Sequence, residues 1–407
     1  MSPLVQTLLP TRLGPSFRWL LASSWTTNLG DGIAAAAGPL LVASLTGDEF
    51  LIALAALTTW APPLLCGLWA GVLSDRYDRR MIVLAANAFR AVVLLAMIAA
   101  LTTGHLTVVA ALIGVALIST AEVFADNTTG TLTPMLVDRD DLALANARLQ
   151  TGFITFNQLA GPSIGAALFT LGRSWPLVSE VLLVLAGMLL VSRVKLPPHG
   201  RTGSPNVRRE IVEGFRWVLH HPPVSTLCLT ILIFNLAFGA AWAVLVLYAR
   251  DRLGLGDFGF GLITTVSAVG GLLGTALYGW ITARVSLGNV MRIGLIIETL
   301  THLILAATRS PLVALPVFFL FGAHAFIWGT TSTTVRQRAV PEHLQGRVSA
   351  VNTICVYAGL VAGSAIGGLL AKQYGVVAPF WAAFAASAVF LILLWPQMTR
   401  IAHDDQL

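Results

Sequence analysis

Long apolar runs recur along the whole chain and are separated by short polar segments. Two parts of these runs, Val108 to Ser119 and Val181 to Val191, contain no charged residue. A membrane-spanning helix needs roughly 20 predominantly apolar residues, whereas a membrane strand shows about 10 residues of alternating polarity. The bilayer offers no partner to an unpaired backbone group, so these runs predict helices. We therefore expect an all-α polytopic membrane protein.

The pattern predicts twelve spans, with six on each side of one long polar stretch. The expected ranges are 17–44, 50–74, 81–102, 106–130, 143–172, 175–194, 222–249, 257–283, 288–308, 311–333, 345–372 and 375–396. We thus expect a six-helix half at 1–194, a cytoplasmic linker at 195–221 and a second six-helix half at 222–407. Within the linker, Ile211, Phe215 and Val218 share one helical face beside charges, which predicts an amphipathic helix on the membrane surface.

Composition supports the membrane interpretation. Of the 407 residues, 56% are hydrophobic and only 11% are charged, whereas a soluble domain carries about 25% charged residues. The three cysteines, Cys66, Cys228 and Cys355, all fall within predicted spans. We interpret them as small packing residues rather than as a disulfide or a metal site.

The basic residues predict the orientation of the chain. Most of the 25 Lys and Arg residues fall on the side of the two termini and the central linker. The positive-inside rule places that side in the cytoplasm. The basic residues are spread over several loops, whereas a nucleic-acid interface needs one clustered patch. Nucleic acid is therefore not an expected partner.

The two halves carry matching segments. Gly71 and Arg76 correspond to Gly279 and Arg284, at an offset of 208 residues. The segment GPSIGAAL from Gly161 corresponds to GSAIGGLL in the second half. Two six-span repeats of this kind predict a transporter with its substrate site near the midplane.

The predicted loop between spans 2 and 3 contains GVLSDRYDRR. It resembles the G-x-x-x-D-R-x-G-R-R signature of the major facilitator superfamily, and the matching positions are Gly71, Asp75, Arg76, Arg79 and Arg80. Asp78 stands where that signature often has glycine. The resemblance implies the major facilitator fold, in which this element is a conformational latch for the outward-open state. We expect Gly71 to admit a neighbouring helix closely and the arginines to hold the loop at the lipid headgroups.

Further segments indicate the branch of the superfamily. Gly161, Pro162 and Gly165 partly match the glycine–proline motif of its antiporters, and this helix-bend motif is expected to let the two halves approach. AEVFADNTTGTLTPMLVDRDDLALANARLQ and RQRAVPEHLQGRVSAVNT are similar to loops of the macrolide-efflux and enterobactin-exporter-like branch. This resemblance implies export of a small molecule driven by the proton gradient.

Charged residues inside the spans are expected to need partners or a function, because burying each costs roughly 2.5–3.5 kcal/mol on insertion scales. The proton-coupling candidates are Asp31, Arg90, Glu122 and Asp126. Asp31 lies between two glycines in span 1, a cavity-lining span in the family, and is expected to load a proton or to bind substrate. A structural carboxylate bonded to nearby Asn28 or to threonines is the alternative. Depth along consecutive spans predicts that Arg90 pairs with Glu122 and Asp126. That network is either a neutralising salt bridge or a switch that protonation loosens.

Aromatic and polar residues on spans 1, 7 and 10 are the candidates for lining the substrate cavity that the family resemblance implies. They are Trp25, Asn28, Asn235, Trp242, His324 and Trp328. Packing or interface anchoring is the alternative role for the tryptophans. Glu180 is expected near a membrane edge. Glu298 and His302 in span 9 are expected to form a structural hydrogen bond rather than to couple protons.

No ATP-binding loop, clustered metal site or G-x-S-x-G motif occurs, so we expect neither an enzyme nor a cofactor or metal. The sequence predicts a multi-pass transporter of the bacterial inner membrane that exports amphipathic organic molecules in exchange for protons. A nutrient importer or exchanger of the same fold, or a transporter-fold enzyme or sensor, is the alternative. The expected partners are membrane lipid, a small-molecule substrate and protons, and the chain is expected to act as a monomer.

Overall fold

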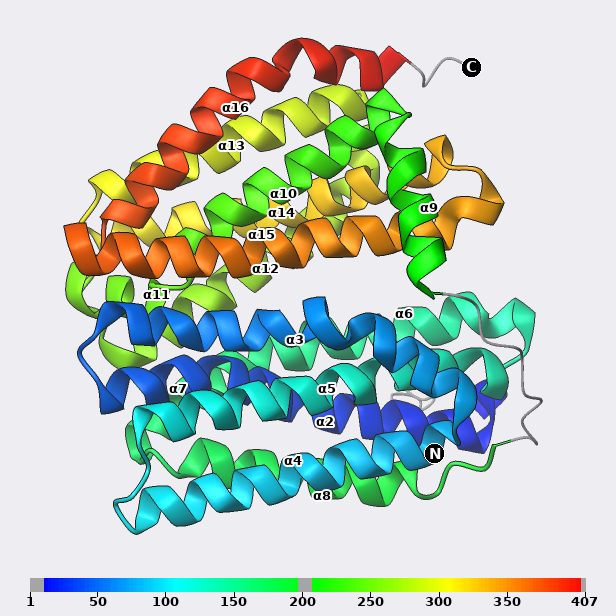
Figure 1. Ribbon diagram of the computed structural model, residues 1–407, viewed down its shortest axis with the longest axis vertical. Helices are drawn as coiled ribbons and strands as arrows, with labels where there is room; N and C mark the ends of the chain where they lie inside the picture. The colour runs from blue at the N-terminus through cyan, green and yellow to red at the C-terminus, as the bar shows by residue number, and fades with distance from the viewer. Residues whose placement is uncertain (1–10, 197–206, 404–407) are drawn as a thin grey trace. The chain divides into compact units, whose positions relative to one another are not determined.

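The computed structural model describes residues 11–196 and 207–403 (Figure 1). Every regular element in these two ranges is a helix. The chain separates into two compact units. Unit 1 comprises Met1–Leu45 with Leu65–Ser204, and unit 2 comprises Thr46–Leu64 with Pro205–Leu407. The division therefore runs through helix α3 (Glu49–Arg76), whose first part groups with unit 2.

Unit 1 is built from six further helices and one π-helical segment. They are α2 (Gly14–Leu45), α4 (Arg79–Thr102), α5 (Val108–Leu136), α6 (Leu142–Gly152), η3 (Phe153–Ala160), α7 (Gly161–Leu171) and α8 (Trp175–Val191). Helix α8 packs against both α2 and α4, and α5 also contacts both of them. Residues on α2, α4, α5 and α8 can therefore meet although they are far apart in the sequence.

Unit 2 follows the linker. Its principal helices are α9 (Val207–Leu219), α10 (Pro222–Trp242), α12 (Gly256–Thr282), α13 (Leu287–Ala307), α14 (Pro311–Ala339), α15 (Gln345–Tyr374) and α16 (Ala378–His403). Helix α10 packs along α15, and α13 packs between α14 and α16 (Figure 1). These contacts place polar residues of α13 and α14 against each other.

Ten of the described helices are long and apolar enough to cross a membrane. Helix α8 is also apolar but has 17 residues. The remaining predicted span, 143–172, is a continuous helical stretch made of α6, η3 and α7. The all-α membrane architecture is confirmed. Ten of the twelve predicted spans correspond to helices of sufficient length, while 143–172 and α8 stay predicted spans.

Close glycine contacts occur at equivalent places in the two units. A Cβ atom on Gly161 would lie 2.6 Å from the Cα of Gly32 on α2, and one on Gly165 would lie 2.4 Å from the carbonyl oxygen of Ile33. In unit 2, a Cβ on Gly367 of α15 would lie 2.2 Å from the carbonyl oxygen of Ala240 on α10. Small residues let helix backbones approach each other in membranes. Glycines in the repeated segments thus serve the same packing in both units.

The glycine–proline motif coincides with an irregularity in the helix. The eight residues before Gly161 form the π-helix η3, and Pro162 follows at the start of α7. Proline has no N–H to donate, so it interrupts the regular helical hydrogen bonds and favours such an irregularity. Gly161 and Gly165 face α2 inside unit 1. The expectation that they let the two halves approach stays a prediction.

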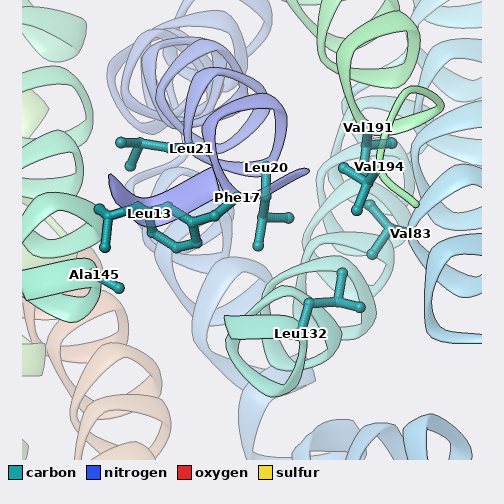
Figure 2. Close-up of a cluster of buried hydrophobic side chains, with 9 residues drawn as sticks. All are labelled: Leu13, Phe17, Leu20, Leu21, Val83, Leu132, Ala145, Val191 and Val194. Atoms are coloured by element: carbon teal, nitrogen blue, oxygen red, sulfur yellow. The ribbon is translucent and has the colours of Figure 1, made fainter. Parts of the chain in front are cut away.

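A cluster of buried apolar side chains packs several helices of unit 1 together. Leu13 is the last residue of the 3-10 helix η1 (Thr11–Leu13), and Phe17, Leu20 and Leu21 lie near the start of α2; all four are at most 2% exposed. They pack with Val83, Leu132, Ala145, Val191 and Val194, which come from four other segments (Figure 2). Lipid tails are as apolar as leucine, so such a cluster holds helices together through close packing more than through exclusion of water.

Helix α9 matches the helix predicted in the linker, but it packs on protein. Val218 is buried in a cluster with Val348, and Gly214 approaches the backbone of Arg347 on α15 (Figure 1). The guanidinium of Arg347 lies 2.9 Å from the carboxylate of Glu213. The apolar face of α9 therefore docks partly on α15, and the position of α9 on the membrane surface stays a prediction.

Candidate functional site: a buried charge cluster in unit 1

Arg90 lies at the centre of a buried charge cluster in unit 1. Its guanidinium forms an ion pair with Asp31 of α2 and lies 3.2 Å from a carboxylate oxygen of Glu180 on α8. The three side chains are no more than 2% exposed. Asn87, one turn before Arg90 on α4, places its amide oxygen 3.5 Å from the guanidinium. The guanidinium of Arg90 on α4 thus binds one carboxylate from α2 and one from α8, and so joins the three helices.

The glycine after Asp31 explains how η3 comes so close to α2. A Cβ on Gly32 would lie 2.5 Å from the backbone oxygen of Asn157 in η3, so only glycine fits at this crossing. A Cβ on Gly30 would lie 3.6 Å from the Cγ of Glu180, which is an ordinary van der Waals contact.

Two further carboxylates extend the cluster along α5. One carboxylate oxygen from each of Asp31, Glu122 and Asp126 lies within 4.8 Å of the other two. Glu122 is half-buried and Asp126 is exposed. The three carboxylates therefore form one group, in which exposure increases from Asp31 through Glu122 to Asp126.

This group brings together more negative charge than Arg90 can neutralise. Two like charges about 4.8 Å apart repel by roughly 3 kcal/mol at an effective dielectric constant of about 20. The carboxylates cannot all be ionised at little cost, so the cluster favours binding a cation or protons. A metal ion would have to compete with Arg90 for Asp31, whereas a proton on Glu122 or Asp126 needs no such displacement.

The direct partners of Arg90 differ from those that the sequence predicts. Its ion pairs are to Asp31 and Glu180, while the predicted partners Glu122 and Asp126 lie beside Asp31 in the same cluster. The sequence did not predict the contact with Glu180, because α8 packs on α2 and α4 and no rule about consecutive spans reveals that packing.

The latch candidates form a braced turn at the end of unit 1. The Nε of Arg79 donates to the carbonyl of Ser74 at 3.0 Å, and its Nη1 donates to that of Thr131 at 3.3 Å. Arg80 donates to the carbonyl of Val194 at 3.1 Å. Asp78, the departure from the family signature, accepts from the backbone N–H groups of Arg80 and Met81 and caps α4. The arginines therefore bind carbonyls near the ends of three helices, where positive charge is favourable.

The other latch residues are less constrained in this structure. Arg76 is exposed. A Cβ on Gly71 would meet no atom within 4 Å, so the expected close approach of a helix at Gly71 is absent from the described contacts. The side chain of Asp75 lies outside the described residues.

Two substrate candidates on α2 are held within unit 1. The indole N–H of Trp25 donates to the carbonyl of Arg148 at 3.1 Å, and the ring lies 5.7 Å from that of Phe156. The amide nitrogen of Asn28 donates to the carbonyl of Ser24 at 2.7 Å. The contacts of Trp25 are those of a packing residue, while Asn28 keeps its amide oxygen for another partner.

Unit 2 brings some of the remaining candidates together. The rings of Trp242 and Phe321 are 5.5 Å apart, and those of Phe321 and His324 are 5.6 Å apart. Asn235 bonds to the carbonyl of Ile231 on its own helix. Trp328 instead packs on Gly294, where a Cβ would lie 2.7 Å from the indole ring.

Sequence reasoning missed several members of an aromatic group around Trp242. Phe238 stacks on Trp242 at 4.5 Å, and Trp60 from the first part of α3 lies 6.3 Å from Phe238. Phe321 and Phe318 complete this group. We call these five residues the aromatic group of unit 2. Phenylalanines in apolar spans carry no distinguishing signal, so only the fold could reveal the group.

Comparison with known proteins agrees with this architecture. A family model described as transmembrane secretion effector matches residues 6–406. The multidrug efflux pump Tap of Mycolicibacterium fortuitum is 28% identical over 396 residues, covering 91% of this chain and 93% of the pump. The enterobactin exporter EntS of Salmonella typhi is 22% identical, covering 93% and 92% of the two chains. The crystal structure of the nucleoside transporter NupG resembles the chain with a TM-score of 0.73 at 13% identity, covering 95% of this chain and 99% of NupG.

Proposed function

The chain belongs to the transmembrane secretion effector family of the major facilitator superfamily, and from this premise we propose that it exports amphipathic organic molecules in exchange for protons. The observation that carries the proposal is the cluster of Asp31, Arg90 and Glu180 with Glu122 and Asp126 beside it. A purely structural ion pair needs one acid for each base, whereas this cluster has four carboxylates around one guanidinium.

The graded exposure of the acidic residues supports a proton path. An exposed Asp126 within a spanning helix would cost roughly 2.5–3.5 kcal/mol if it faced lipid. This face of α5 therefore contacts water in the working protein. A proton would enter at Asp126, pass to Glu122 and reach the buried Asp31.

Protonation of Asp31 would act on helix packing. A neutral Asp31 no longer balances Arg90, which would keep Glu180 as its charged partner. The contact of α2 with α4 would then weaken relative to that of α4 with α8. A ligand can shift a conformational equilibrium only if it binds the two conformations with different affinities. The proton meets this condition here, because Asp31 accepts it only in the conformation in which the ion pair with Arg90 is open.

The proposed substrate class rests on unit 2 and on the relatives. The aromatic group offers half-buried rings at Trp60, Phe238 and Trp242. Aromatic walls with few polar groups suit large amphipathic molecules, and such faces also attract organic cations. Tap is a multidrug efflux pump and EntS exports enterobactin. Drugs, antibiotic-like metabolites and siderophores are the candidate cargoes.

The proposed setting follows from the charge distribution. The braced turn with Arg79 and Arg80 would face the cytoplasm of a bacterial inner membrane, and both termini would lie on the same side. The chain would work as a monomer by alternating access.

Transport into inverted membrane vesicles tests the proposal. Ethidium, tetraphenylphosphonium, a macrolide and a catecholate siderophore would each be offered under an imposed pH gradient, acidic inside. We expect at least one to accumulate, and an uncoupler to abolish the accumulation. Accumulation that survives the uncoupler would contradict proton-driven export.

A further inference from the structure

Unit 2 contains a second buried group of titratable side chains, on α13 and α14. Glu298 and His302 lie one turn apart on α13, and His324 faces them from α14. The Nε2 atom of His324 is 3.2 Å from one carboxylate oxygen of Glu298, and that of His302 is 3.8 Å from the other. The three residues are 8%, 2% and 5% exposed, in chain order. Burial of this kind costs free energy unless the charges are balanced.

The packing around the group fixes its position. One turn before Glu298, Gly294 receives the indole ring of Trp328, which lies one turn after His324. The α13–α14 contact thus repeats as a ladder in which Gly294 faces Trp328 and Glu298 faces His324. The packing of the Trp328 ring on Gly294 fixes the register of α13 against α14. This register in turn places His324 beside Glu298.

Among the described residues, no other charged group on the neighbouring helices is closer to Glu298 than His302 and His324. Helix α13 carries Arg292, about 9 Å away along the axis at 1.5 Å per residue, and the guanidinium of Arg292 lies over Trp395. The part of α16 with described side chains has no titratable residue. The remaining titratable groups on the packed helices α10, α12 and α14 are Cys228, Asp257, Tyr278, Arg336 and Arg338.

These other groups are far from Glu298 along their helices. Arg336 is 12 residues beyond His324, or about 18 Å along α14. Tyr278 reaches Thr331 at 3.5 Å, which is two turns from His324. Asp257 stands in the first turn of α12, and Cys228 is a buried thiol in the cluster around Val348.

The segment η4 (Tyr248–Arg252) also bonds to α13, with the Tyr248 hydroxyl 2.7 Å from the carbonyl oxygen of Leu305 and the Arg252 guanidinium 3.1 Å from that of Ala306. Ala306 is about 12 Å beyond Glu298 along the axis. The two imidazoles are therefore the groups placed to balance Glu298.

The imidazoles are themselves incompletely satisfied. None of the four ring nitrogens of His302 and His324 has a hydrogen-bond partner with good geometry. A buried polar atom without a partner costs about 1–3 kcal/mol. One proton shared by this group would balance Glu298 and give a ring nitrogen a charge-assisted hydrogen bond. Histidine is the side chain whose charge changes most readily between about pH 5 and pH 8.

We propose that Glu298, His302 and His324 form a second proton-binding site, which is occupied and vacated during the transport cycle. The proposal rests on the proposed function only in that protons drive export. The ring of His324 lies 5.6 Å from that of Phe321, so an imidazolium here would repel an organic cation bound to the aromatic group of unit 2. Proton binding at this site and binding of a cationic substrate therefore compete.

Proton uptake by the purified full-length chain in weakly buffered detergent tests this site without any substrate. Between about pH 8 and pH 5, Glu298→Gln should take up about one proton fewer than the wild type. The matched control is Thr299→Val on the same helix, where the hydroxyl bonds only to its own helix at Leu295. Uptake by Glu298→Gln equal to that of the wild type would overturn the proposal.

A second measurement follows the imidazole rings directly. Nitrogen-15 NMR of the histidine-labelled wild-type chain should show a buried ring that changes from neutral to imidazolium over the same pH range. The signal of this ring is assigned by its disappearance in His324→Gln or in His302→Gln. Infrared spectroscopy would report the ionisation of the Glu298 carboxylate. If both rings stay neutral and this carboxylate stays ionised over the whole pH range, the proposed site is contradicted. Loss of proton uptake in Asp31→Asn but not in Glu298→Gln would reject this site and leave the proposed function standing, whereas the reverse would reject the unit 1 proton path.

Discussion

Arg90 and Asp31 form a buried ion pair across unit 1, although 59 residues separate them in the chain. The pair connects α2 to α4, and Glu180 extends it to α8. Removing one partner of a buried pair leaves an uncompensated charge, which is far more destabilising than removing both. The pair therefore makes distinct predictions for stability and for transport.

Arg90→Met should destabilise the protein strongly, because Asp31 and Glu180 would lose their common cation. The expected loss is about 3–5 kcal/mol, seen as a clear fall in the thermal unfolding temperature in detergent. The double variant Arg90→Met with Asp31→Asn should recover part of the loss. Arg250→Met is the control, because Arg250 forms an exposed pair with its neighbour Asp251 and such pairs contribute at most about 1 kcal/mol. Equal destabilisation by Arg90→Met and Arg250→Met would argue against a stabilising role for the buried pair.

Glu122→Gln should impair proton-driven accumulation while leaving substrate exchange at equal pH intact. The amide cannot carry a proton from Asp126 to Asp31, but it keeps the shape of the side chain. We expect accumulation to fall about tenfold, within the usual range of coupling free energies. Glu213→Gln serves as the control in the same vesicle assay, because this exposed side chain of α9 lies outside the unit 1 cluster. Unchanged accumulation with unchanged pH dependence in Glu122→Gln would remove Glu122 from the proton path.

Gly161→Ala should lower the unfolding temperature, because the added methyl group would lie 2.6 Å from the backbone of Gly32. Gly130→Ala on α5 is the matched control, since a Cβ there meets no atom within 4 Å. A helical Gly→Ala change without a clash is expected to stabilise by about 0.5–1 kcal/mol. The two variants should therefore shift the unfolding temperature in opposite directions, and a similar shift in both would show that the α2–α7 contact is not tight.

The loop before α3 provides a test that depends on pH. Asp48 accepts a hydrogen bond from the ammonium group of Lys372, which lowers the pKa of this carboxyl below its usual value. A lowered folded-state pKa contributes stability above the unfolded-state pKa, and that contribution is lost as the pH falls through the folded-state value. Lys372→Met should lower the unfolding temperature slightly near neutral pH and have no effect in acid.

The size of this effect is limited because both side chains are partly exposed. We expect less than about 1 kcal/mol, decreasing with salt. Asp48→Asn separates the ion pair from helix capping, because the amide oxygen can still accept from the backbone N–H groups of Phe50 and Leu51. Asp48→Ala removes both interactions and should cost more. If Asn and Ala behave alike at every pH, the cap contributes nothing measurable.

The helices and the buried charges could be predicted from the sequence because both depend on local properties. Hydropathy alone indicates where a span must lie, and any charge within it is conspicuous. The partners of those charges could not be predicted, because they depend on which helices pack together. Depth along α4 and α5 suggested Glu122 as the partner of Arg90, but the packing of α8 on α2 and α4 put Glu180 there instead.

The same distinction holds for the aromatic and glycine positions. Trp25 resembled a cavity residue by its span, yet Gly152 provides the surface on which it packs. Gly161 and Gly165 were recognised as a motif, but only the structure shows that α2 is their partner. His324 and Glu298 appeared unrelated in the sequence, and the register between α13 and α14 brings them together.

The most direct test of proton exchange through the unit 1 cluster is proton movement driven by substrate alone. Proteoliposomes would be loaded with a transported probe, at equal pH on both sides and with the membrane potential clamped, and the internal pH would be followed as the probe leaves. We expect the wild type to move protons inward as the probe moves out, and Asp31→Asn to bind the probe but to move no protons. Undiminished probe-driven proton movement in a folded Asp31→Asn protein would contradict this expectation.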